Sequence, residues 1–159
     1  MRRNSIGVTF VAIAYFSTWT TYGTWLPGDD RGWFHSGRGW RDPDQGQAFA
    51  AALRMSADAV ILTPVQRELV QSVIAEHAAF RGWELHAVNC RRNHVHVVVS
   101  AAGRPIELPR EQFKSWTTRR LKELSGGERS DWWTERGWDV YIDDLDDLAA
   151  VVEYVPDGQ

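Results

Sequence analysis

The sequence feature that most constrains the fold is a β-branched stretch over residues 91–100 with histidines at alternate positions. Successive side chains of a strand point to opposite faces of a sheet, so His94 and His96 share one face while the intervening valines form the other. Two neutral imidazoles at this spacing can bind one divalent metal ion. The same alternation is also typical of the half-solvated face of an ordinary antiparallel sheet.

The composition predicts one globular domain over residues 1–159. The chain is 43% hydrophobic and 25% charged, which is ordinary for a protein with a sizeable core. Cys90 is the single cysteine, so an intramolecular disulfide is excluded, and we expect a packed thiol in a reducing, cytoplasmic compartment. The apolar run of residues 7–16 is too short to cross a bilayer, so we expect no membrane partner.

The rest of the chain predicts alternating strands and helices. We expect, in order, a strand over 8–21, a long loop over 22–46, a short helix over 47–55, a helix from Thr63-Pro64 to Arg81-Gly82, a strand over 83–90 that forms a hairpin with the histidine strand, a helix over 107–124, a last strand ending near 142, and a helix from Asp143 or Asp144 to about Val155. The loop is rich in glycine and tryptophan, and its rings could fill a small core or stack on unpaired bases.

The charge distribution bears on a nucleic-acid partner. The net charge of −3 argues against one, but residues 91–122 carry eight basic and two acidic side chains, a local net charge of +6. The basic residues expected to contact phosphates are Arg91, Arg92, Lys114, Arg119 and Arg120. A solvated charged face is the alternative interpretation.

The terminal helix combines an apolar stripe with a tyrosine on its other side. The stripe is expected to consist of Leu145, Leu148, Ala149, Val152 and Val155. At 100° per residue, Tyr154 lies about 180° from Leu145 and should point away from the core. Its hydroxyl would then be available for chemistry, although an ordinary surface tyrosine has the same pattern.

The stretch of residues 93–99, Asn-His-Val-His-Val-Val-Val, resembles the His-hydrophobic-His motif of the HUH endonucleases, and specifically of the single-tyrosine transposases. Residues 18–28, the pair Lys114 and Trp116, and residues 133–142 resemble the REP-associated branch of that family. The resemblance covers nearly the whole chain. It implies an α+β fold, with a ferredoxin-like antiparallel sheet and helices packed on one face.

The resemblance also implies a chemistry and a set of site residues. Tyr154 would be the nucleophile, His94 and His96 would bind Mg²⁺ or Mn²⁺, and Gln159 would be the third ligand. The family's simplest pattern places the glutamine four residues after the tyrosine, whereas here the spacing is five and Pro156 intervenes, so Asp157 and His86 stay open as alternatives. The implied partner is single-stranded or hairpin DNA, cleaved and rejoined through a 5′-phosphotyrosine link.

Two other functions remain open at this point. One is a catalytically inactive single-stranded nucleic-acid-binding or regulatory protein on the same fold. The other is a His-x-His metal hydrolase acting on a small substrate, which would need a closed apolar pocket. The sequence leaves open the hairpin recognised, the metal, the choice between monomer and homodimer, and whether Tyr154 serves its own site or a partner's.

Overall fold

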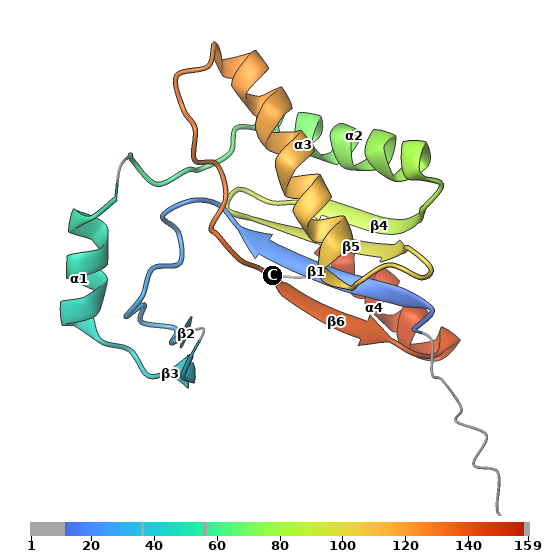
Figure 1. The fold of residues 1–159 in the computed structure, drawn as a ribbon, viewed down its shortest axis with the longest axis horizontal. Helices are drawn as coiled ribbons and strands as arrows, with labels where there is room; N and C mark the ends of the chain where they lie inside the picture. Colours follow the sequence, from blue (N-terminus) through green and yellow to red (C-terminus); the bar gives the residue numbers. More distant parts are fainter. Residues whose placement is uncertain (1–11, 36, 56, 158–159) are drawn as a thin grey trace, which may run out of the picture.

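The computed structural model describes residues 12–35, 37–55 and 57–157. Its elements in chain order are β1 (Ala14–Thr20), β2 (Trp33–His35), β3 (Gly39–Arg41), α1 (Gln45–Leu53), α2 (Pro64–Arg81), β4 (Glu84–Cys90), β5 (His94–Ser100), α3 (Glu107–Ser125), β6 (Trp138–Ile142) and α4 (Leu145–Asp157), as labelled in Figure 1. The expected first strand is confirmed from Ala14 onward, and its residues 8–11 lie outside the described part.

The main sheet has four strands in the order β4-β5-β1-β6, and each neighbouring pair is antiparallel. The succession β1-α2-β4-β5-α3-β6 is the βαββαβ arrangement of ferredoxin-like folds. The predicted α+β class and the hairpin that contains the histidine strand are therefore confirmed. The histidine strand β5 lies inside the sheet, with β1 and β4 on either side.

The helices cover both faces of this sheet rather than one. α2 and α3 lie on one face, where Val95, Val97 and Val99 join the main core, and α4 lies on the other (Figure 1). The expectation that the helices pack on one face is thus wrong for α4. The reason is that the histidine-bearing face also carries apolar side chains, notably Val98, which packs against Val155 of α4 in a second core.

The ends of α2 show how local sequence fixes an element. The Thr63 hydroxyl accepts from the backbone N–H of Gln66, and the Gln66 side chain accepts in turn from the backbone N–H of Thr63. At the other end Gly82 takes φ of 70°, a left-handed conformation that ends helices at little cost for glycine. The predicted helix is confirmed at both boundaries.

The segment between β1 and α2 forms a small unit beside the main sheet (Figure 1). β2 and β3 make a separate two-stranded sheet, and α1 follows it. The tryptophans that were expected in a loop differ in their exposure to solvent. Trp33 is buried, whereas Trp40 is exposed and its ring lies edge-on to that of Trp25. In the part of the chain that is described, no helix is both long enough and apolar enough to cross a membrane.

Candidate functional site

One row of paired residues crosses the whole sheet on the face that α4 partly covers. Asn89 of β4 is opposite His96 of β5, His96 is opposite Thr18 of β1, and Thr18 is opposite Trp138 of β6. Directly paired residues of antiparallel strands point to the same side. Each of the four strands therefore contributes one side chain to the same line across this face.

Hydrogen bonds orient both imidazole rings of the histidine strand. Nδ1 of His94 lies 2.8 Å from Oδ1 of Asn93, and because a carbonyl oxygen only accepts, Nδ1 carries the proton and Nε2 presents a lone pair. Nδ1 of His96 lies 2.8 Å from Oγ1 of Thr18. The two ring centroids are 4.8 Å apart and the rings are nearly perpendicular.

The two remaining ring nitrogens are buried and unpaired. Among the described residues, Nε2 of His94 and Nε2 of His96 have no hydrogen-bond partner. A buried polar atom without a partner costs about 1–3 kcal/mol, and such atoms in folded proteins often mark an ion or water that completes them. Two neighbouring rings whose Nδ1 atoms are held by hydrogen bonds and whose Nε2 atoms lack a partner could supply two ligands to a metal ion.

The electrostatic environment keeps these imidazoles neutral. Burial lowers the pKa of His96 to about 4, and the charge that His94 would carry if protonated and the positive charge of Arg91 act in the same direction. Burial, followed by the charge of Arg91, also lowers the pKa of His94. A metal ion binds the neutral ring, so both residues are ready as ligands at neutral pH without losing a proton.

The terminal helix brings Tyr154 to this pair. The Tyr154 ring centroid is 6.2 Å from that of His96, and 49% of the side chain remains exposed. The end of α4 is held by Asn89, whose amide donates to the carbonyl oxygens of Val155 and Pro156, and by Arg91, which donates to Pro156. The expected apolar stripe is wrong at Leu145, which is 75% exposed because α4 only begins there, and at Ala149, which is exposed, whereas Val151 packs against the second core in its place.

The donor set fits a divalent ion in part. Within the described residues no group of three or more His, Cys, Asp or Glu side chains is gathered for a metal. Gln159 and the side chain of Asp157 lie outside the part that the structure describes. His86 forms a hydrogen bond with Ser100. Ser100 lies four residues along β5 from His96, which is about 13 Å at the rise of a strand. His86 is therefore too far from His96 to be the third ligand.

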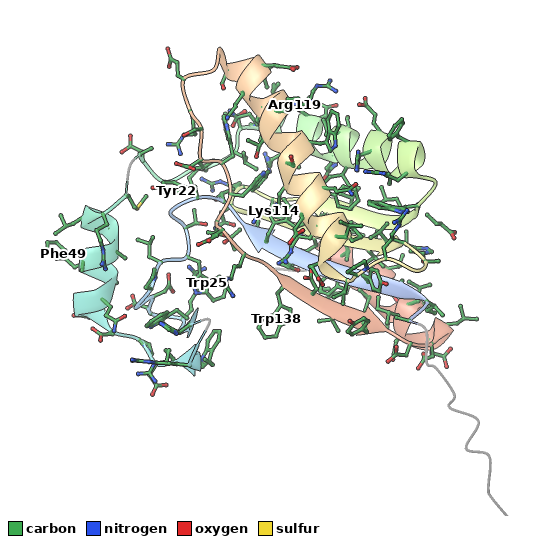
Figure 2. The ribbon with its side chains drawn as sticks, in the orientation of Figure 1. Tyr22, Trp25, Phe49, Lys114, Arg119 and Trp138 are labelled. Atoms are coloured by element: carbon green, nitrogen blue, oxygen red, sulfur yellow. The ribbon has the colours of Figure 1, made fainter. Side chains whose placement is uncertain are left out.

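The expected phosphate-binding residues are divided between the two faces. Arg91 lies beside the histidine pair, whereas Lys114, Arg119 and Arg120 belong to α3 on the opposite face (Figure 2). Lys114 donates to the carbonyl oxygens of Thr134 and Arg136, and burial, with Arg110 acting in the same direction, lowers its pKa to about 8. Arg120 is engaged by Glu76 and Glu123, and Arg119 lies over the Trp116 ring.

Sequence reasoning did not identify Thr18, Asn89 or Trp138 as members of the site. Their positions depend on the register of three strand pairs, and alternation within one strand carries no information about register. Thr18 lies in the stretch that resembles the transposases, but nothing there indicated a contact with His96.

Fold and site together define an α+β domain with a ferredoxin-like sheet, a histidine pair on an inner strand and a tyrosine on the helix above it. No family model and no curated protein matches the sequence. Among solved structures, the chain is similar to a REP-associated tyrosine transposase bound to a REP hairpin, with a TM-score of 0.53 and 14% identity over 98% of this chain and 68% of that one. It is also similar to a protein of Deinococcus radiodurans R1 assigned as a transposase, with a TM-score of 0.52 and 12% identity over 99% of this chain and 97% of that one. These likenesses show a shared fold.

Proposed function

We propose that this protein is a single-tyrosine DNA transposase that cleaves and rejoins single-stranded, hairpin-bearing DNA. The observation that carries the proposal is the buried, unpaired Nε2 atoms of His94 and His96 beside the exposed Tyr154. A nucleophile next to two neutral metal ligands is what phosphodiester cleavage requires. That a protein of similar fold binds a REP hairpin supports DNA as the partner.

His94 and His96 would hold Mg²⁺ or Mn²⁺, with Gln159 proposed as the third ligand. When bound, the ion would polarise the scissile phosphate and stabilise the charge that develops on it. Among the chain's own residues, Thr18 and Asn93 hold the Nδ1 atoms of the two rings and so leave both Nε2 atoms available as ligands. Arg91 adds positive charge at the edge where a phosphate would enter.

Tyr154 would attack phosphorus in line with the leaving 3′ oxygen. The bond between its hydroxyl oxygen and phosphorus forms as the bond to the 3′ oxygen breaks, the phenolic proton passes to solvent, and the leaving oxygen takes a proton from solvent to become a 3′-OH. Since a free tyrosine has a pKa near 10, this attack depends on the charge of the site. Attack by another 3′-OH on the phosphotyrosine reverses the step and rejoins DNA without ATP.

The test is formation of a covalent protein–DNA product. A library of labelled DNA hairpins with single-stranded flanks is incubated with the protein and Mn²⁺ and resolved on a denaturing gel. We expect a shifted band with the wild-type protein that is lost in Tyr154→Phe and in His96→Ala. The matched control is Tyr141→Phe, which removes the hydroxyl of an exposed tyrosine on the opposite face of the sheet and should leave the band unchanged.

A wild-type protein that binds hairpins across the library and yields no covalent band would overturn this function. The protein would then be the inactive single-stranded nucleic-acid-binding alternative. A band that survives Tyr154→Phe would instead assign the nucleophile to another residue.

A further inference from the structure

Trp138 stands out among the tryptophans because it lies on the histidine-bearing face and is 58% exposed. Trp19, Trp132 and Trp133 are all buried in the main core. Figure 2 shows Trp138 projecting from the start of β6, at the edge of the sheet. A large exposed aromatic ring in line with a candidate active site is placed where it can contact a ligand bound there.

The register of the sheet fixes the distance between Trp138 and the metal ligands. Trp138 is opposite Thr18, and Thr18 is opposite His96, so two strand spacings separate Trp138 from His96, or about 10 Å. This is comparable to the reach from one phosphate of a single strand to a neighbouring base. Among the described elements, α4 packs mainly on β4 and β5, and Trp138 at the start of β6 keeps more than half of its surface exposed.

The backbone around Trp138 is held on both sides. Before it, Gly137 is packed so closely that an added Cβ would lie 2.5 Å from Cδ of Arg110 and 2.8 Å from the carbonyl oxygen of Thr18. After it, Asp139 is a half-buried partner of Arg110, with 3.3 Å between Oδ2 and the guanidinium nitrogen. The chain therefore presents the Trp138 ring from a fixed position, which lowers the entropy cost of stacking on it.

We propose that Trp138 is a stacking platform for an unpaired base of the DNA strand whose phosphate lies at the histidine pair. The inference rests on the proposed function, because that function places the phosphate. An aromatic ring can stack on the π face of any base, but only an unpaired base has that face available. The contact would therefore favour single-stranded over duplex DNA and would not depend on the DNA sequence. Trp138 would thereby position the strand that enters the site, while Tyr154 acts from the other side.

The test measures affinity separately from chemistry. In a Tyr154→Phe background, fluorescence anisotropy follows binding of labelled oligothymidine to the parent, to Trp138→Leu and to Trp138→Phe. We expect Trp138→Leu to weaken binding about tenfold, as loss of one base–aromatic stack does, and Trp138→Phe to keep most of the affinity. The matched control is Phe80→Leu, which removes an exposed ring from α2 on the opposite face and should not change binding.

A second readout locates the base. Oligothymidine substituted with 5-iodouracil should crosslink on irradiation to the peptide that contains Trp138. Equal affinity of Trp138→Leu and its parent, an equal loss in Phe80→Leu, no binding by the parent, or crosslinks only elsewhere would each overturn the proposal. The covalent-band assay reports on the proposed function separately, so a missing band with a Trp138 crosslink would refute the transposase activity and leave the platform standing.

Discussion

The side-chain amide of Asn89 donates a hydrogen bond of 2.9 Å to the carbonyl oxygen of Val155, joining the edge strand β4 to the last turn of α4. The last carbonyl groups of a helix have no partner within the helix, and Asn89 supplies one from the sheet. Asn89 is also directly opposite His96 in the sheet. The same residue thus fixes the end of the helix that carries Tyr154 and belongs to the row that carries His96.

Replacement of Asn89 by alanine should slow formation of the covalent DNA product much more than it weakens metal binding. The hydrogen bonds lost are worth about 1 kcal/mol of folding free energy, but the position of Tyr154 depends on them. Product formation with time and the free energy of unfolding check both effects. Gln112→Ala, which removes the 2.6 Å contact to His77 on the opposite face, is the control that should lose stability and not product.

The stability of the metal-free protein should fall as the pH is lowered from 7 to 5. Burial places the pKa of His96 at about 4 in the folded state, below the ordinary value of about 6.5, so between these values the unfolded chain binds more protons. Urea unfolding in the presence of EDTA measures this slope, and His96→Gln should show a shallower one. An identical slope in the variant would mean that the pKa of His96 does not differ between the folded and the unfolded protein.

Cys90 should resist thiol reagents until the protein unfolds. Its side chain is buried, and desolvation raises its pKa to about 12, so almost no thiolate is present at neutral pH. Reaction with a chromogenic disulfide should be slow in buffer and complete in denaturant. Fast labelling of the native protein would contradict the packed position of this thiol.

The substitution Gly137→Ala should destabilise the protein by about 1–3 kcal/mol through overpacking. The added methyl would press on Arg110 and on the Thr18 carbonyl, and it would separate β6 from β1 next to the site. Chemical denaturation measures the loss. Gly37→Ala is the matched control, because the nearest atom to an added Cβ there is 3.6 Å away and belongs to the flexible His35 side chain.

The local parts of this fold were predictable from sequence because local chemistry determines them. Thr63 and Gly82 mark the ends of α2, and the alternation from His94 to Ser100 assigns a face to every residue of β5. β2 and β3 were missed because strands of three residues show no period to detect. Leu145 was misplaced because an apolar stripe does not reveal which of its residues the sheet reaches.

Three residues of the candidate site were predictable from the sequence, and the residues that pair with them in the sheet were not. His94, His96 and Tyr154 come from a motif and a resemblance, and the structure brings them together. The partners Thr18 and Asn89 depend on pairings between distant segments. His86 shows the limit most clearly, since an irregularity between Leu85 and Ala87 shifts the register of β4 at that point.

The row formed by Asn89, His96, Thr18 and Trp138 depends on the register of the four strands, so some parts of the chain tolerate insertions and deletions and others do not. Insertion of one residue within β1 would turn Thr18 toward α2 and α3 and break the row, since the side-chain period of a strand is two. Insertions between β1 and α2 would leave every pairing of the main sheet intact. Homologues should therefore vary in length across residues 24–58 and keep constant spacing within each of the four strands, while Val60 and Leu62, which are buried in the main core, should keep their place before α2.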